Sequence, residues 1–310
     1  MHHLVIWLRI SSLAILLFSI SSCGTDGTIH THVYDASDTQ DPEPIAYYVS
    51  ASVSGLTGAG LVLELNDREQ IQVAVDGTFS FIDSPLEMGS DYNVSIQTQP
   101  ATPSQFCAVT AGSGIIEDAN PEAIEIVCTT NTFRVGGLLS GMSGEGLVLS
   151  LNDTWEVSPE ENGDLTFQTA YLLDGTDYSV QVNQQPEGPN QTCVVENGQG
   201  SIGGSDVTSM VVRCVTNRYA VGGTVAGLQG SGLVLKMGTV ELAITENGSF
   251  AFSEDLVEDG RLFEVTVLAQ PVEPNQTCTV ENGGGMIAGS AYTDTLVTCV
   301  DDEVTEPDDD

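Results

Sequence analysis

The sequence contains very few basic residues. Lysine and arginine together number 7, against 44 aspartates and glutamates, and Lys236 is the single lysine. The formal net charge is −37. Proteins that bind nucleic acid or anionic lipid by charge present clusters of Lys and Arg, so this composition argues against both partners. A strongly acidic surface keeps a protein dispersed; a specific cation or a cationic partner is the alternative interpretation.

Histidine is equally scarce, and all four histidines lie near the start of the chain, at His2, His3, His30 and His32. The remaining residues therefore cannot supply a Ser-His-Asp or Cys-His catalytic arrangement. His30 and His32 could touch a metal ion, but a solvated position in a polar linker explains them more simply.

Long hydrophobic runs are absent except at the N-terminus. Arg9 precedes the apolar stretch Ile10–Ile20, which is too short and interrupted to predict a membrane-spanning helix. The next residues, "SSC", end at Cys23 and resemble a bacterial lipobox. Similarity to bacterial lipoproteins implies that residues 1–22 are a signal peptide, and that Cys23 carries lipid, including palmitate, in a membrane. In that family Gly24, in place of Asp, favours the outer membrane of the bacterial cell envelope. An ordinary signal peptide with an incidental cysteine is the alternative.

The six remaining cysteines are evenly spaced. Each of three pairs is separated by 21 residues, and the pairs themselves recur after 86 and then 85 residues. In an exported protein this pattern favours disulfides within each copy; zinc binding would need clusters of the CxxC type and histidines. The predicted disulfides are Cys107–Cys128, Cys193–Cys214 and Cys278–Cys299.

The cysteines belong to a threefold repeat. The stretch "QPVEPNQTCTVENGGG" at 270–285 matches "QPEGPNQTCVVENGQG" at 185–200 and, more loosely, "QPATPSQFCAVTAGSG" at 99–114. The copies also share "GLVL" segments near their starts and "DGTFSF", "NGDLTF" and "NGSFAF" farther on. A period of about 85 residues is long enough for each copy to hold its own core.

Within each copy the hydrophobic pattern has a period of two. In "LVLELN", Leu61, Leu63 and Leu65 point one way and the intervening residues point the other. Asp76-Gly77 and its two counterparts lie between β-rich runs, so we expect hairpin turns there. About seven short strands per copy and no helix predict an all-β fold: three tandem antiparallel β-sandwich domains of about 85 residues, each with one disulfide.

The order "GLVL … DGTFSF … YNVSIQTQP" resembles Cna-B-like and carboxypeptidase regulatory-like sandwiches, which are Ig-like or prealbumin-like. The resemblance covers about 47–302 and implies the fold more than a function. Cna-B-like domains often carry a lysine-to-Asn/Asp isopeptide crosslink. Copies one and two contain no lysine, so the disulfides would replace that crosslink.

The copies contain no further chemistry that we can identify. No acidic position recurs in all three at a candidate site, and no DxDxD-type run of calcium ligands appears. We therefore expect no catalytic residue, no cofactor and no metal site, although stabilisation by calcium stays an alternative. Trp155 occurs in copy two only, where it could stack on carbohydrate or pack locally.

These observations predict a lipid-anchored, extracytoplasmic stalk or adhesive protein that is not an enzyme. A surface module that binds a glycan or a protein partner is the alternative. The membrane, through the lipid on Cys23, is the expected partner, and nucleic acid is not. The predicted organisation is: signal peptide 1–22, tether 23–45, repeats 46–131, 132–217 and 218–302, and acidic tail 303–310.

Overall fold

The computed structural model describes residues 45–302, and all regular secondary structure in this range is β-strand. The predicted signal peptide, Cys23, most of the tether, the four histidines and the acidic tail lie outside these residues. Within 45–302 there is no helix with the length and apolarity needed to cross a bilayer.

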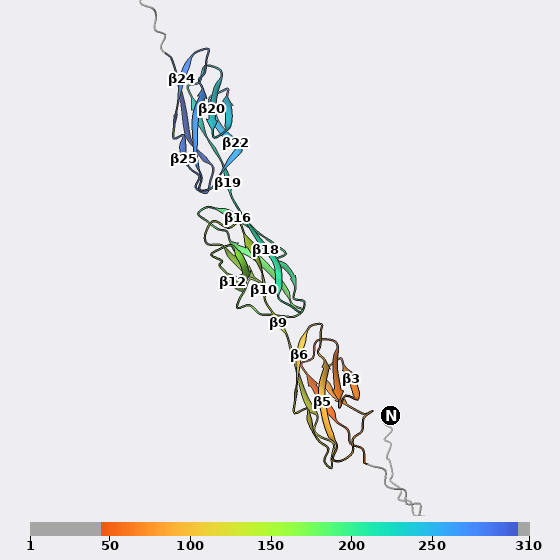
Figure 1. Ribbon diagram of the computed structural model, residues 1–310. Helices are drawn as coiled ribbons and strands as arrows, with labels where there is room; N and C mark the ends of the chain where they lie inside the picture. The colour runs from red at the N-terminus through yellow and green to blue at the C-terminus, as the bar shows by residue number, and fades with distance from the viewer. Residues whose placement is uncertain (1–44, 303–310) are drawn as a thin grey trace, which may run out of the picture. The chain divides into compact units, whose positions relative to one another are not determined.

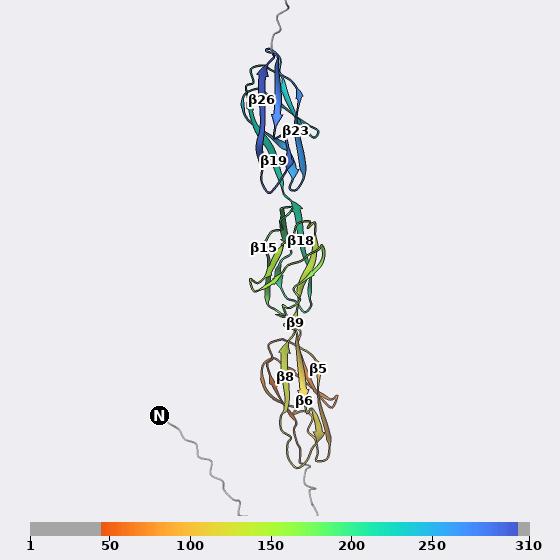
Figure 2. The same ribbon diagram turned by 90° about the vertical axis from the view of Figure 1, so that its left-hand side faces the viewer.

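Each repeat folds into two facing four-stranded sheets (Figures 1 and 2). The first repeat contains β1 (Ser50–Ser54), β2 (Leu61–Leu65), β3 (Glu69–Val73), β4 (Gly77–Ser80), β5 (Asp91–Thr98), β6 (Gln105–Thr110), β7 (Ser113–Ile115) and β8 (Ile124–Thr130). Its sheets have the strand orders β4-β1-β8-β6 and β3-β2-β5-β7.

The other two repeats use the same arrangement. The second contains β9 (Thr132–Phe133), β10 (Val135–Ser140), β11 (Val148–Leu151), β12 (Trp155–Val157), β13 (Gly163–Thr166), β14 (Leu172–Leu173), β15 (Asp177–Gln184), β16 (Gln191–Glu196), β17 (Gln199–Ser201) and β18 (Val207–Thr216). Its short strands β9 and β14 form an additional two-stranded sheet. The third contains β19 (Arg218–Ala226), β20 (Leu233–Met237), β21 (Val240–Ile244), β22 (Gly248–Glu258), β23 (Leu262–Ala269), β24 (Gln276–Glu281), β25 (Gly284–Met286) and β26 (Tyr292–Asp301).

The predicted fold class is confirmed, with one difference in strand direction. The first long strand of each repeat runs parallel to the last strand, as in β1 with β8, β10 with β18 and β19 with β26. Parallel neighbours need a long connection, and the other strands of the repeat provide it. All other pairs are antiparallel, including the cysteine-bearing pairs β6 with β8, β16 with β18 and β24 with β26.

The predicted hairpin turns at Asp76-Gly77, Asn162-Gly163 and Asn247-Gly248 are wrong. Asp76 lies between β3 and β4, which belong to opposite sheets, so the chain crosses the sandwich there. The Asp76 carboxylate accepts backbone N–H bonds from Gly55 and Leu56, at 3.1 and 2.8 Å. The hairpin between β2 and β3 turns instead at Asn66-Asp67, where both residues have positive φ as a type I′ turn requires.

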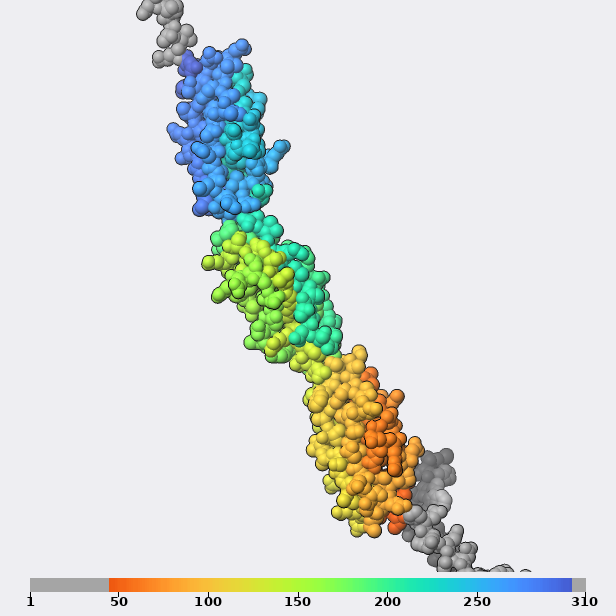
Figure 3. Space-filling view, viewed as in Figure 1, coloured from red at the N-terminus to blue at the C-terminus, as the bar shows by residue number. Residues whose placement is uncertain are grey.

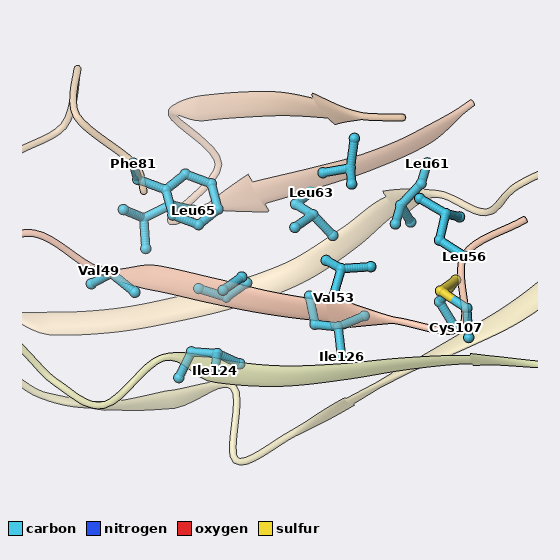
Figure 4. Close-up of a cluster of buried hydrophobic side chains, with 14 of the residues drawn as sticks. Val49, Val53, Leu56, Leu61, Leu63, Leu65, Phe81, Cys107, Ile124 and Ile126 are labelled. Atoms are coloured by element: carbon cyan, nitrogen blue, oxygen red, sulfur yellow. A yellow bond between two sulfur atoms is a disulfide. The ribbon is translucent and has the colours of Figure 1, made fainter. Parts of the chain in front are cut away.

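Each sandwich is filled by the residues that the period-two pattern points inward. Leu61, Leu63 and Leu65 of β2 are fully buried and face Val53 of β1 and Ile126 of β8 (Figure 4). The second and third repeats bury their own separate clusters of hydrophobic side chains. In Figure 3 the residues of each repeat lie together in a separate compact block. Each repeat therefore has a core of its own.

In each repeat a buried glutamine links the strand that carries the first cysteine to the loop that follows the first long strand. In the second repeat, the Oε1 atom of Gln191 accepts N–H bonds from Ser143 and Gly144, at 2.7 and 2.9 Å, and its Nε2 atom donates to Gly141 O at 2.9 Å. Gln105 and Gln276 make the same bonds in their repeats. Gly141 has φ +78°, and a Cβ there would lie 2.3 Å from Cys214 O, so only glycine fits this close approach.

We predict that Gln191→Leu lowers the free energy of unfolding of the second repeat by roughly 3 kcal/mol, because it leaves one buried N–H group, one partly buried N–H group and a partly buried carbonyl without partners. Native-state hydrogen exchange of the second repeat measures the loss. Gln168→Leu is the control, since Gln168 is exposed and surface changes cost within about 0.5 kcal/mol. An equal effect of the two substitutions would contradict this role for Gln191.

Candidate functional site

The six repeat cysteines form the disulfides Cys107–Cys128, Cys193–Cys214 and Cys278–Cys299. In each pair the two cysteines lie directly opposite one another on neighbouring antiparallel strands. All six are buried. The bond thus joins the edge strand of one sheet to the last strand of the repeat.

A second contact of the repeated stretch recurs in all three repeats and covers the outer side of that edge strand. The Gln99 side chain donates to Cys107 O at 3.0 Å and accepts from Cys107 N at 2.8 Å. Gln185 and Gln270 do the same at Cys193 and Cys278. The amide takes the place of a neighbouring strand, which reduces the tendency of an exposed edge to pair with another chain.

The loop before the first cysteine of a repeat contacts the repeat that follows. In the first repeat this loop contains a cis peptide bond at Thr102-Pro103, followed by Ser104. The Ser104 N–H donates to the Asp174 carboxylate of the second repeat, with Ser104 N and Asp174 Oδ2 2.5 Å apart. The other oxygen, Oδ1, accepts from Gly204 N at 2.7 Å. Asp174 is buried, with 7% of its surface exposed.

The same arrangement recurs between the second and third repeats. Asn190 N donates to Asp259 Oδ2 and Gly289 N donates to Asp259 Oδ1, each at 2.6 Å. Asp259 is also 7% exposed. We call this pair of contacts the carboxylate clamp, which in each case consists of one aspartate and the two backbone N–H groups that it accepts.

Backbone contacts surround each carboxylate clamp. Asp174 N donates to Asn131 O at 2.9 Å, and Asn131 N donates back to Ser104 O at 3.0 Å. In the second junction the equivalent bonds join Asp259 to Asn217 and Asn217 to Asn190, at 2.8 and 2.9 Å. The glycine after each aspartate brings its backbone close to the proline of the preceding repeat, since a Cβ at Gly175 would lie 3.7 Å from Pro103 Cβ.

The clamp depends on the ionised form of the aspartate. Donation by the Ser104 N–H is the main cause that lowers the pKa of Asp174 below the ordinary value of 3.8. Burial opposes this shift, while the N–H groups of Gly204 and Gly175 and the Ser104 hydroxyl lower the pKa further. An ionised carboxylate can accept at both oxygens, and protonation converts one of them to a donor.

Sequence reasoning missed the clamp aspartates because it looked for acidic positions shared by all three repeats. Three repeats in series have only two junctions, so the signal is an aspartate present in two copies. The position equivalent to Asp174 and Asp259 is Met88 in the first repeat, which has no clamp and is 67% exposed. The pair Asp-Gly at 174–175 and 259–260 was the available pattern.

Other predicted candidates have structural positions. Trp155 lies in β12 and packs against the core of the second repeat, so local packing is the better explanation of this residue. Among residues 45–302, no group of three or more Asp, Glu, His or Cys side chains is arranged to hold a metal ion.

No protein-family model matches the chain, and no curated protein matches it. Among solved structures, the Bacillus anthracis TIE protein matches with a TM-score of 0.52 and 11% identity over 82% of this chain and 51% of that one. The Streptococcal ancillary pilin matches with a TM-score of 0.23 and 10% identity, over 81% of this chain and 99% of that one.

The pilus adhesin SpaC from Lactobacillus rhamnosus GG matches with a TM-score of 0.22 and 10% identity, over 83% of this chain and 43% of that one. Identities this low speak only for the fold, and only the TIE protein among these three has a TM-score above one half. The chain spans about half the length of the TIE structure. The chain is a tandem β-sandwich repeat protein.

We predict that replacing Cys193 and Cys214 together with alanine lowers the free energy of unfolding of the second repeat by about 3 kcal/mol, the value for a closed loop of roughly 20 residues in the chain-entropy model. Because each repeat has its own core, the first and third repeats should keep their stability. Hydrogen exchange resolved by repeat measures all three. A matching loss in the other two repeats would show that the cores do not act independently.

We predict that Asp174→Asn opens the first junction. The amide keeps one acceptor oxygen but turns an NH₂ group toward the second N–H donor, so exchange of the Ser104 amide proton should accelerate by roughly ten- to a hundredfold, as expected for loss of a hydrogen bond to a charged group. Asp164→Asn, on the exposed surface of the same repeat, is the control and should leave the Ser104 amide unchanged.

The same measurement against pH tests the ionised form. The pKa of Asp174 is lowered in the closed junction, so the clamp contributes fully above the ordinary value of 3.8 and is lost as the pH falls through the lowered pKa. Protection of the Ser104 amide, corrected for intrinsic exchange, should fall in that acidic range in the wild type. In Asp174→Asn it should not vary there, and a persisting variation would assign the pH dependence to another group.

Proposed function

We propose that this protein is a lipid-anchored stalk of the bacterial cell surface, built from Cna-B-like or prealbumin-like repeats, with a structural or adhesive role and no catalytic activity. Lipid on Cys23 would hold the chain in the membrane, most simply the outer membrane. The three stapled repeats would then carry the far end of the chain away from the bilayer.

The carboxylate clamp is the observation that carries this proposal. A chain of domains that act independently would need no ordered contact between them, whereas a spacer must limit bending at every junction. Asp174 and Asp259 make the same two hydrogen bonds at successive junctions, and they hold the loop of one repeat against the next. The disulfides and the buried glutamines Gln105, Gln191 and Gln276 limit motion inside each repeat in the same way.

Composition is consistent with this role. The excess of acidic residues, 44 against 7 basic ones, keeps a surface-exposed spacer soluble and repels like-charged neighbours. The binding-module alternative drew on Trp155 as an exposed stacking residue, but this side chain packs against the core of its own repeat.

We predict that the wild-type chain fractionates with membranes and that its mass corresponds to lipid on Cys23 after loss of residues 1–22. Cys23→Ala should remove the lipid and release the protein from the membrane fraction, because stable anchoring needs the acyl chains. Intact mass spectrometry of the membrane and soluble fractions provides the readout. An unlipidated wild-type chain would refute the anchor.

Small-angle scattering of the released Cys23→Ala chain tests the spacer role separately. We expect a narrow distribution of distances between repeats, and a broader one when Asp174→Asn and Asp259→Asn are added. The paired control is Asp164→Asn with Asp294→Asn, since both residues are exposed. Repeats that are as variable in the parent as in the clamp variant would refute the spacer and leave the anchor untouched.

A further inference from the structure

Each closed junction joins a loop of one repeat to an aspartate of the next. The third repeat has the same loop, and no residue within 45–302 supplies an aspartate to it. Its loop has the cis peptide bond at Glu273-Pro274 followed by Asn275, as in the first two repeats. Asp302 N donates to Asn275 O at 3.1 Å, which reproduces the bonds from Asn131 and Asn217 to their loops. The backbone is therefore already shaped as it is at the two closed junctions.

Exposure separates this loop from its two counterparts. Pro103, Ser104, Pro189 and Asn190 are half-buried because the next repeat covers them, whereas Pro274 and Asn275 are exposed. Among residues 45–302, no carboxylate accepts the Asn275 N–H. We call this loop, with Asp302, the terminal acceptor, because it would receive another domain. In the hydrogen bond itself its Asn275 N–H would be the donor.

The first repeat does not carry the residues that form the aspartate side of a junction. Where the second and third repeats have an aspartate and, farther on, the glycine whose N–H binds it, the first repeat has Met88 and Asp118. Ile45 takes the place of Asn131 and Asn217, since Tyr47 pairs with Leu86 and so sets Ile45 opposite Met88. Ile45 and Met88 are 72% and 67% exposed. The first repeat thus lacks the clamp carboxylate, the glycine at the second donor position and the polar partner of a junction.

We propose that the terminal acceptor binds a β-sandwich domain outside residues 1–310, one that presents an exposed aspartate followed by glycine. The two closed junctions define this chemistry, because each pairs the loop with an Asp-Gly sequence held by a second N–H from its own domain. A second copy of this chain is a poor occupant, since Asp174 and Asp259 are already engaged and Met88 has no carboxylate.

The chain's own tail is also a poor occupant. Residues 303–310 contain aspartates but no glycine, so they offer no Asp-Gly loop. The inference does not depend on the lipid anchor, because the terminal acceptor is formed by the third repeat alone.

Asp302 modulates the affinity of the terminal acceptor. Its Oδ1 atom accepts from the Thr277 hydroxyl at 2.7 Å, just as Asn217 Oδ1 accepts from Thr192. The difference is a negative charge beside the position of an incoming carboxylate, and like charges at close range repel. Asp302→Asn restores the residue type of the inner junctions, so it should strengthen binding.

An engineered copy of the same chain can stand in for the unidentified partner. The donor variant carries Ile45→Asn, Met88→Asp and Asp118→Gly, which give the first repeat the residues of an inner junction. Its matched control carries Met88→Asn in place of Met88→Asp. Each variant is titrated, in detergent, into the wild-type chain labelled with ¹⁵N at asparagine. The titration extends to about 1 mM, because covalently linked modules such as the repeats meet at millimolar effective concentrations, and an interaction evolved for such linkage can be weak between separate chains.

We expect the donor variant to shift the Asn275 amide resonance downfield in a saturable way, and the control to bind at least about tenfold more weakly, as for a lost hydrogen bond to a charged group. Asp302→Asn in the labelled chain should increase the affinity several-fold. Circular dichroism and thiol alkylation, which check folding and disulfides, should match the wild type in all variants.

Three results would overturn the proposal. The first is an Asn275 resonance that does not move with a folded donor variant. The second is equal binding of the donor variant and its control, which would remove the carboxylate from the interaction. The third is a shift of the Asn275 resonance on adding unlabelled wild-type chain, or on replacing Glu306, Asp308, Asp309 and Asp310 with their amides, which would make a second copy or the tail the occupant.

Discussion

The hydrogen bonds from Ser104 and Asn190 to two buried carboxylates are the contacts on which the order of the repeats depends. Each repeat folds around its own core, so nothing in the cores themselves fixes one repeat against the next. Beside the backbone bonds through Asn131 and Asn217, Asp174 and Asp259 provide this connection, since their two oxygens accept one N–H from the preceding repeat and one from their own. Each of these carboxylates is therefore fully hydrogen-bonded only when both neighbouring repeats are folded.

The repeated stretch around the first cysteine of each copy is explained by the different contacts of its residues. In the second repeat, Gln185 covers the edge of β16, and the cis Gly188-Pro189 bond shapes the loop. Asn190 reaches the following repeat and Gln191 joins the two ends of its own. Cys193 closes the disulfide. Each of these residues makes a separate contact, and all of the contacts except the one to the following repeat are made in all three sandwiches.

Much of this could be predicted from the sequence, because the deciding features are local. Alternation along Leu61, Leu63 and Leu65 identified the strands and their buried face, and cysteine spacing identified the disulfides. The sheet order could not be obtained in this way. Asp76-Gly77 has the composition of a hairpin turn, yet the chain crosses between sheets there, and only the contacts of Asp76 with Gly55 and Leu56 distinguish the two.

The junction chemistry was also hidden, since Asp174 and Ser104 lie 70 residues apart and neither stands in a familiar motif. The turn after Asn197-Gly198 likewise leads first to β17 in the opposite sheet, and only then to β18, which carries the second cysteine. Local composition identifies a turn, but the strand that it leads to depends on pairing between distant segments.

The parallel pairing of the first and last long strands has a mechanical consequence. A load on the chain enters a repeat at the start of β1 and leaves it at the end of β8, and these two points lie at opposite ends of one parallel pair. Tension therefore pulls the two strands past each other and loads all their hydrogen bonds together, instead of opening them one at a time. If that pair does yield, the Cys107–Cys128 bond keeps the segment between the cysteines closed, so part of each repeat cannot be drawn out at all.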